Sequence, residues 1–353
     1  MKILYVGPSW DGSSSIQRVK ALQRAGHDVT TLDDTQFQPR FPLLRKIAFR
    51  LMMGPAVDRL NQAILRQCEE LQPDILWSDK TLMLRPSTLQ QLRKMGIATV
   101  SYMIDNAFGP RKDPGFRLYY KAIPSFDLHC TQRDVNIPDY LSRGARAVMK
   151  VQTAYEREVH FPPPPGWSDA NRDREVSFIG QPYDDRAAIF ERLANAGVPL
   201  RVAGSRDYWS RALPPELMAK LGITGELFGA DYREGIWRSK INLAFVTKSN
   251  QDEVAHRAFE ITGCGAFLLA ERSPGHMAKF VEDEEAVFFT GDEELLEKIR
   301  RYLPDEAART QIAQAGYARA ERDGYHNDHQ MKLIMDRMAT IVPQVKAAAA
   351  ALR

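Results

Sequence analysis

Cysteine is scarce in this sequence of 353 residues, which contains only three. Cys68, Cys130 and Cys264 lie far apart and form no C-x-x-C pair, which excludes both a disulfide framework and a zinc site built on paired cysteines. Dispersed cysteines are typical of a reducing compartment. The seven histidines also lack the spacing of metal ligands. We therefore expect a cytoplasmic protein without a structural metal.

Long apolar runs are also missing, and none approaches the ~20 residues that a helix needs to cross a bilayer. Met1 leads directly into KILYVG, without the basic region, apolar run and cleavage site of a signal peptide. The net charge of +3 is a weak excess, and the arginines are scattered rather than interleaved with aromatic residues. We expect a soluble or peripheral protein with no nucleic-acid partner.

The sequence does contain a regular alternation of apolar strands and helical segments. KILYVG (2–7), a helix near 16–24 and GHDVTTLDD (26–34) form a strand–helix–strand unit, which indicates a parallel sheet. Further strands are predicted at 74–79, 98–105 and 126–131, and a last strand within 143–153. The length, with 44% hydrophobic and 26% charged residues, is ordinary for two globular α/β domains.

The loop PSWDGSSS, after the first strand, places small residues before a helix. Gly12, Ser13 and Ser14 let backbone N–H groups approach a ligand at the helix N-terminus, where an anion is stabilised. An ordinary serine N-cap is the alternative. No G-x-G-x-x-G occurs, so the sequence does not support a dinucleotide site of the usual kind.

Two further features of the first half are candidates for function. Asp79 and Asp105 end predicted strands, at the edge where open parallel sheets bind ligands, although Asp105 also suits a helix N-cap. Residues 40–66 mix arginine and lysine with large apolar residues. They form either two helices that pack on the sheet or a segment that lies in a membrane interface on anionic headgroups.

Four consecutive prolines divide the chain, in the run HFPPPPGWSDANRDR from His160 to Arg174. Proline removes a backbone donor, so this run continues neither a helix nor a central strand and is typical of a stiff connector. We predict a first domain over 1–160, a linker over 161–174, a second domain over 175–324 and a C-terminal helix over 325–353.

The second half repeats the alternation, with the strand candidates VSFIGQP, LRVAGS, ELFGA, INLAFV, AFLLAE and EAVFF. The first two end in Gly180 and Gly204, and Arg186 and Arg206 follow them. Strand-end glycines let a backbone approach a diphosphate, and guanidinium groups form charge-assisted pairs with phosphate. A surface position without a ligand is the alternative for each arginine.

The stretch DEVAHRAFEITGCGAFLLAE (252–271) reads as a polar loop, a helix starting near Val254, a Gly-Cys-Gly turn and a buried strand. Asp252 and Glu260 flank that helix, and ionised carboxylates accept hydrogen bonds from polyols. A solvated helix face that carries two acids is the alternative. Arg257 and His256 precede Glu260 and are candidates for contact with a phosphate.

The residues HRAFEITGCGAFLLAE resemble the signature of retaining GT-B glycosyltransferases of the group 1 superfamily. They are most similar to the spore-maturation-protein-like branch, which carries R-x-F-E-x-x-x-C-G. By this resemblance, Glu260 holds the ribose of a nucleotide-sugar donor. Asp252 contacts the transferred sugar, although the family usually has Glu there. The order of F-x-G, L-x-V-x-G and an acidic helix before C-G is similar to the family's donor domain.

The resemblance implies an α/β fold of two doubly wound Rossmann-like domains that face each other across a cleft. The C-terminal helix is expected to cross back to the first domain. Asp105 approaches the reacting sugar, His256 lies at the donor, and the first loop faces the acceptor and the donor phosphates. The implied contacts to the donor come from Arg186, Arg206, Arg257, Gly180, Gly204 and Gly265.

The implied reaction moves a sugar from a nucleotide-sugar donor to a glycan, glycolipid or protein acceptor, with retention of configuration and without a cofactor. No D-x-D occurs, so the resemblance implies no metal. Acceptors in this superfamily are often lipid-linked, which favours a peripheral membrane contact through 40–66. A sugar-nucleotide epimerase and a non-catalytic relative that binds nucleotide sugar or a partner protein are the alternatives.

Overall fold

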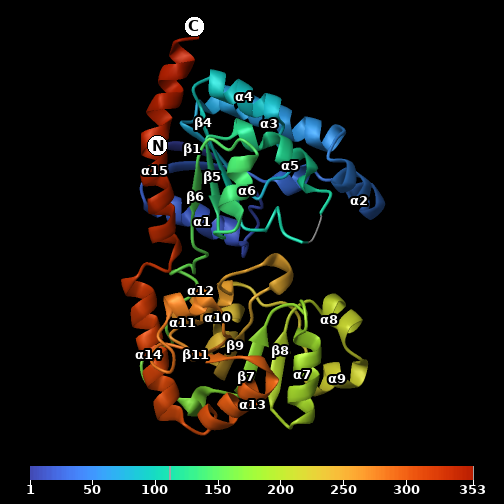
Figure 1. Ribbon diagram of the computed structural model, residues 1–353, viewed down its shortest axis with the longest axis vertical. Helices are drawn as coiled ribbons and strands as arrows, with labels where there is room; N and C mark the ends of the chain where they lie inside the picture. Colours follow the sequence, from blue (N-terminus) through green and yellow to red (C-terminus); the bar gives the residue numbers. More distant parts are fainter. Residues whose placement is uncertain (111–112, 353) are drawn as a thin grey trace. The chain divides into compact units, whose positions relative to one another are not determined.

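The computed structural model describes residues 1–110 and 113–352, in two compact units. The first unit comprises Met1–Thr153 and Asn327–Arg353, and the second comprises Ala154–His326. The chain therefore enters the second unit before the proline run and returns to the first unit for its last helix (Figure 1).

The first unit contains a six-stranded parallel sheet in the order β2-β1-β3-β4-β5-β6. Its strands are β1 (Lys2–Val6), β2 (Asp28–Leu32), β3 (Ile75–Asp79), β4 (Ala98–Met103), β5 (Leu128–Thr131) and β6 (Val148–Lys150). Its helices are α1 (Ser14–Arg24), α2 (Pro42–Leu51), α3 (Pro55–Leu71), α4 (Pro86–Lys94), α5 (Phe116–Ala122), α6 (Asn136–Ser142) and α15 (Asn327–Ala350), with 3₁₀ turns η1 (Asp34–Phe37) and η2 (Ile123–Ser125).

Helices cover both faces of this sheet, so its central strands β3 and β4 are buried along their whole length. Alternate residues of β1 show the two faces. Ile3 packs in a cluster with α1 and α15, whereas Leu4 packs in a cluster with α3 and α4. Figure 1 shows α15 on one side of the sheet and α3 and α4 on the other.

The last helix confirms the prediction that the C-terminus packs on the first domain. α15 contacts α1 and β4, and it contributes Met331, Ile334 and Met338 to the core. This helix begins at Asn327 and continues through Pro343.

The second unit contains a five-stranded parallel sheet in the order β11-β10-β9-β7-β8. Its strands are β7 (Arg174–Ile179), β8 (Leu200–Ala203), β9 (Ser239–Ala244), β10 (Leu268–Glu271) and β11 (Val287–Phe289). Its helices are α7 (Arg186–Asn195), α8 (Arg206–Ala212), α9 (Pro215–Lys220), α10 (Gly229–Trp237), α11 (His256–Gly263), α12 (Pro274–Lys279), α13 (Gly291–Tyr302) and α14 (Glu306–Arg322), with 3₁₀ turns η3 (Asp169–Asn171) and η4 (Lys248–Asn250).

The proline run packs on this second unit. Trp237 Nε1 donates to the carbonyl of Phe161 at 2.9 Å, and Trp167 Nε1 donates to the carbonyl of Trp237 at 3.2 Å. The prolines supply no N–H groups there, and the two tryptophans make the polar contacts instead.

One prediction about local structure is wrong. The strand predicted at ELFGA (226–230) does not form, because Phe228 is 49% exposed and Gly229 adopts a left-handed φ of +54° that opens α10. The helix predicted near Val254 does form, and it begins at His256 because the backbone of Ala255 is still extended. Among the described residues, no helix combines the length and apolar character needed to cross a bilayer.

Candidate active site

The carboxyl ends of the parallel strands in the second unit carry most of the predicted donor residues. Gly180 follows β7 and Gly204 follows β8, while α11 begins in the connection between β9 and β10. In open parallel sheets, ligands bind at this edge, where helix N-termini and strand ends meet. Glu260 lies one turn into α11, and its surroundings define the centre of the site.

Glu260 is held by side chains from three separate segments. Tyr232 of α10 donates its hydroxyl to Glu260 Oε2 at 2.5 Å, and Arg257 Nη1 lies 3.4 Å from the same oxygen. The Nε2 atoms of His160 and His256 each lie 3.8 Å from Oε1. Only 12% of the Glu260 side chain is exposed. The carboxylate therefore has donors or positive charge around both oxygens.

The charge state of Glu260 follows from this shell. Burial opposes ionisation of the carboxyl group, but the neighbouring His256, His160 and Arg257 and the Tyr232 hydroxyl together outweigh burial and lower the pKa of Glu260 to about 2. The group is thus a carboxylate at neutral pH. Tyr232 shows the converse effect, because burial and the adjacent Glu260 raise the pKa of its phenol despite the nearby Arg257.

His160 is a neutral imidazole that points a donor at this carboxylate. Its ring is 2% exposed, and burial lowers its pKa to about 4. The backbone N–H of Glu156 donates to Nδ1 at 3.1 Å, so the proton of the neutral ring sits on Nε2, which faces Glu260. His256 instead hydrogen-bonds through Nε2 to the carbonyl of Ala154 at 2.9 Å.

The guanidinium group of Arg186 hydrogen-bonds mainly to backbone carbonyl groups. It donates to the carbonyls of Gln181, Phe245 and Val246 and to Thr247 Oγ1, at 3.1–3.3 Å, and the residue is 5% exposed. It therefore fixes the segment after β9. Arg206 differs, because it is exposed at the start of α8 and makes no ion pair with the described residues.

The two strand-end glycines are required by packing. A Cβ on Gly204 would lie 2.1 Å from the carbonyl oxygen of Gly180, and a Cβ on Gly180 would lie 2.6 Å from the ring of Phe178. Trp209 Nε1 donates to the Gly180 carbonyl at 3.0 Å. These contacts hold the ends of β7 and β8 together and keep both backbones free of side chains.

Asp252 lies in the loop between η4 and α11, and this loop is held at several points. Asp252 N donates to Thr247 O at 3.1 Å, and Asn250 Nδ2 donates to Asp252 Oδ1 at 2.9 Å. Asp184, from the loop after β7, accepts from Lys248 N at 2.8 Å and from Ser249 N at 3.1 Å. The loops after β7 and β9 are thus linked by hydrogen bonds.

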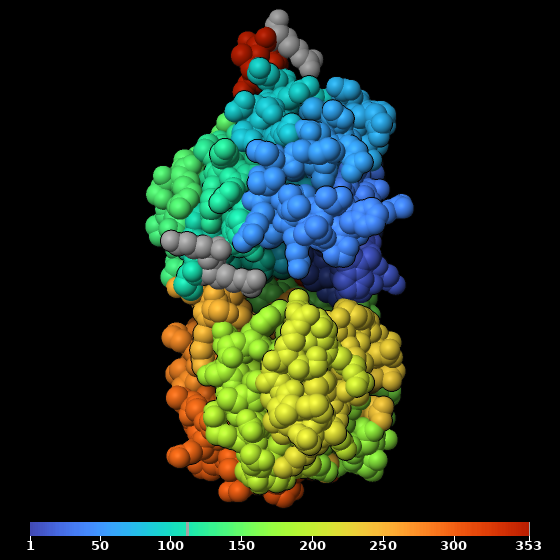
Figure 2. Space-filling view, turned by 90° about the vertical axis from the view of Figure 1, so that its right-hand side faces the viewer, coloured from blue at the N-terminus to red at the C-terminus, as the bar shows by residue number. Residues whose placement is uncertain are grey.

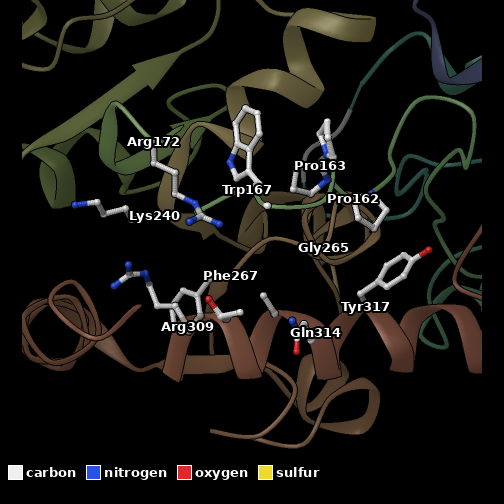
Figure 3. A pocket seen from close by; sticks show the side chains of 14 residues that line it. Pro162, Pro163, Trp167, Arg172, Lys240, Gly265, Phe267, Arg309, Gln314 and Tyr317 are labelled. Carbon is white, nitrogen blue, oxygen red and sulfur yellow. The ribbon is translucent and has the colours of Figure 1, made fainter. Parts of the chain in front are cut away.

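Gly265 lies away from this group, at the opposite end of α11, with φ +61°. It lines a separate cavity of about 220 Å³ with residues of the proline run and α14, including Trp167, Arg172, Lys240 and Arg309 (Figure 3). Lys240 is the second residue of β9, so this cavity lies at the amino ends of the strands. Its cations pair with acids, as in Arg172–Asp169, Arg309–Asp169 and Lys240–Glu175. It lacks the position and the charge of a diphosphate site.

In the first unit, the predicted loop forms the cap of α1. Gly12 has φ +96°, and Ser13 Oγ accepts from Ile16 N at 3.1 Å and donates to Pro8 O at 3.0 Å. Ser14 Oγ accepts a 3.4 Å hydrogen bond from Arg18. Ser13 is therefore an N-cap, and the backbone of the loop carries any contact to a ligand.

The two strand-end aspartates have different surroundings. Asp79 is buried and pairs with Arg18 through Nε–Oδ2 at 2.7 Å and Nη2–Oδ1 at 3.1 Å. Asp105 is 38% exposed and forms an ion pair with Lys80 at 2.6 Å. Asp105 therefore remains accessible from solvent, whereas Asp79 holds β3 to α1.

Sequence reasoning missed Tyr232 and His160, which complete the shell of Glu260. Their positions in the chain carry no motif that links them to α11. Within residues 1–110 and 113–352, no three His, Cys, Asp or Glu side chains gather in a group that could hold a metal ion.

The comparison with protein families gives a match for residues 186–336, to a family described as glycosyl transferase-like. The matched segment includes α7, α10 and α11, and therefore Arg186, Tyr232 and Glu260. The match therefore shows that this segment, less than half of the chain, is similar to glycosyltransferases. No curated protein matches the sequence.

Solved structures show that the chain has the GT-B fold. The chain is similar to HepE from Anabaena, determined in complex with UDP-glucose, with 14% identity, a TM-score of 0.67, and coverage of 96% of this chain and 100% of HepE. Sucrose-phosphate synthase from Thermosynechococcus elongatus is 16% identical, with a TM-score of 0.69 and coverage of 99% and 100%. α,α-Trehalose 6-phosphate synthase from Burkholderia multivorans is 14% identical, with a TM-score of 0.63 and coverage of 100% and 98%.

Proposed function

We propose that this chain transfers a sugar from a nucleotide diphosphate sugar to an acceptor hydroxyl, with retention of configuration. The observation that carries the proposal is the ionised carboxylate of Glu260, fixed at the carboxyl edge of the second sheet. The two histidine rings lie 3.8 Å from its Oε1 atom, beyond hydrogen-bond distance, so this oxygen can accept short hydrogen bonds from the hydroxyls of a ribose.

The remaining residues of the site divide into two roles. Asp252 binds hydroxyls of the transferred sugar, while Arg206, Arg257 and His256 meet the diphosphate. Arg186 is a positioning residue, because its guanidinium holds the segment 245–247 that leads to Asp252. The bare backbones of Gly180 and Gly204 let the diphosphate approach.

In the reaction, the bond from the anomeric carbon to the β-phosphate oxygen breaks, and the leaving diphosphate takes the electron pair. The acceptor oxygen bonds to the same face of the anomeric carbon and gives its proton to a donor phosphate oxygen. Cationic side chains and the N-terminus of α11 stabilise the negative charge on the leaving group. Asp105 is the alternative base.

The donor and the subfamily can be proposed more narrowly. HepE has been solved with UDP and with UDP-glucose, and a trehalose-6-phosphate protein from E. coli with UDP-2-fluoro glucose. We therefore take a uridine diphosphate sugar as the first donor to test. The residues Arg257 to Gly265 support the spore-maturation-protein-like branch.

A peripheral membrane contact belongs to the same proposal. None of the ten residues of α2 is buried, and Phe41, Leu43, Leu44, Ile47 and Leu51 are each 45–71% exposed. In Figure 2 this segment lies on the surface of the first unit. Arg40, Arg45, Lys46 and Arg50 accompany these residues, and no acidic residue occurs from 35 to 57. We propose that α2 lies on the cytoplasmic face of an anionic membrane.

The donor site is tested by thermal unfolding with UDP, GDP, ADP and CDP, each with and without an attached sugar. A ligand that binds only the folded protein raises Tm by mass action. We expect a rise with uridine nucleotides that Glu260→Gln reduces. A Tm that none of these ligands changes would contradict the proposed donor site. Product analysis with UDP-glucose then separates transfer from epimerisation.

A further inference from the structure

A second cavity lies at the carboxyl edge of the sheet in the first unit. It measures about 340 Å³, near the lower end of the range for ligand pockets. Asp34, just after β2, and Lys80, just after β3, stand at this edge. α2 and the start of α3 form the opposite wall, through Phe49, Met52 and Val57.

The walls of this cavity are mainly apolar. Ala48, Phe49 and Met52, from α2 and its C-terminal cap, and Val57, from α3, line it together with Leu82 and Met83, which follow β3. The outer side chains of α2 are also apolar, as Leu44 and Ile47 show. No residue of α2 is buried, although the helix has apolar side chains on both sides, so neither apolar side is fully covered by the protein. One of these apolar sides faces the cavity.

Asp34 is the polar feature that the fold itself does not explain. The residue is 7% exposed, it lines the cavity, and its Oδ1 atom has no hydrogen-bond partner among the described residues. Burial raises the pKa of Asp34 to about 6, so ionisation of this carboxyl group costs free energy in the folded protein. Buried polar atoms are satisfied in almost all native structures, so an unpartnered oxygen at a cavity wall points to a ligand donor.

The cavity also has cations. Arg45 and Lys46, on α2, are exposed and make no ion pair with the described residues. Lys80 pairs with Asp105 at 2.6 Å and has a left-handed φ of +56°, a strained conformation for a residue with a side chain. An anionic group is therefore favoured at the cavity, next to apolar walls.

We propose that this cavity binds the acceptor, and that the acceptor is an amphiphile with an apolar chain, a hydroxyl and an anionic group. The chain lies between Phe49, Met52 and Val57. The hydroxyl donates to Asp34 Oδ1, and the anionic group meets Arg45 and Lys46. This inference rests on the proposed transferase function, since it names the class of the acceptor.

The test is calorimetric titration without nucleotide, with probes kept below their micellar concentrations. The probes are dodecyl phosphate, 1-dodecyl-glycerol 3-phosphate, dodecyl maltoside and inorganic phosphate. We expect one site for both alkyl phosphates, because each has a dodecyl chain for the apolar walls and a phosphate for the cations. Dodecyl maltoside and inorganic phosphate should each bind at least about tenfold more weakly. Equal binding of dodecyl maltoside overturns the anionic part of the proposal.

Variants separate the cavity from the outer face of α2. Arg45→Ala with Lys46→Ala should lower affinity for dodecyl phosphate about tenfold, whereas Arg50→Ala, on the same helix but outside the cavity, should change it less than about twofold. These side chains are exposed, so the variants should fold. An equal loss in Arg50→Ala places the chain on the outer face and refutes the cavity.

Asp34→Leu tests the hydroxyl contact. It should remove the preference for 1-dodecyl-glycerol 3-phosphate over dodecyl phosphate, an effect of about tenfold. An unchanged preference contradicts the role of Asp34. The Tm rise with UDP is measured on the same samples. A protein that binds alkyl phosphate but not UDP refutes the proposed function alone, and one that binds UDP but no amphiphile refutes this inference alone.

Discussion

At the scale of single residues, two arginines of similar position in the sequence have different tasks in the structure. Both follow a strand-end glycine, and the sequence predicts phosphate contact for each. Arg186 is buried and donates to main-chain carbonyls, whereas Arg206 is exposed. Burial and the identity of the partner distinguish them, and neither can be read from a local motif.

The two arginines give a matched prediction. Arg186→Leu removes hydrogen bonds to several buried carbonyls, so it should lower the free energy of unfolding by about 2–4 kcal/mol. Arg206→Ala should change that energy by less than about 0.5 kcal/mol. It should still weaken UDP binding several-fold through loss of a phosphate contact. Urea unfolding and UDP titration of both variants check this. Equal destabilisation would contradict the assignment.

Glu260 makes a prediction about pH. Its pKa in the folded protein, about 2, is below the ordinary value of 4.5, so its ionisation stabilises the folded state. This contribution is complete above about pH 4.5 and is lost as the pH falls towards about 2. The difference in unfolding free energy between wild type and Glu260→Gln should therefore narrow over this window in urea titrations. A difference that stays constant would show that the carboxylate lacks its cationic surroundings.

At the scale of elements, the sequence predicted the strands well and the loops poorly. Buried strands such as 75–79 are recognisable because both faces are covered and the run is mostly apolar. The strand predicted at ELFGA is wrong because a short apolar run does not distinguish a strand from the start of a helix. Here the left-handed φ of Gly229 ends the extended backbone and begins α10. Tyr232 and His160 were missed because only the tertiary fold brings α10 and residue 160 to α11.

α2 exposes five large apolar side chains, and it carries a prediction of its own. Replacing Leu43, Leu44 and Ile47 with serine should reduce binding to phosphatidylglycerol-containing vesicles about tenfold or more, because it removes apolar side chains from the interface. Tm should fall by no more than a few degrees, since none of the three is buried. Co-sedimentation with vesicles measures the binding. Phosphatidylcholine vesicles are the control, and equal binding to both would contradict an electrostatic contribution.

At the scale of the whole molecule, the alternation of strands and helices was enough to predict two parallel α/β sheets, and the resemblance added the return of the last helix. Both predictions are confirmed. The chain enters the second unit after Thr153. Composition identified the proline run, but it could not show that tryptophans pack that run onto the second unit.

Three buried histidines set the response of the folded protein to acid. Burial lowers the pKa of His129, His160 and His276 to about 4 each, from an ordinary 6.5. The unfolded chain therefore takes up protons between about pH 6.5 and pH 4 that the folded protein does not, and stability falls as the pH decreases through this window. We expect the urea midpoint to decline between about pH 7 and pH 5. A midpoint that stays flat or rises would show that these rings are protonated in the folded state.

The central claim is that Glu260 holds the ribose of a nucleotide-sugar donor, and the most direct measurement is calorimetric titration of UDP into three proteins. Wild type should bind, and Glu260→Gln should bind about 10- to 100-fold more weakly, since the ribose hydroxyls lose a charged acceptor. Glu175→Gln, whose carboxylate pairs with Lys240 at the start of β9, should bind like wild type. Equal affinity in Glu260→Gln and wild type would contradict the assigned site.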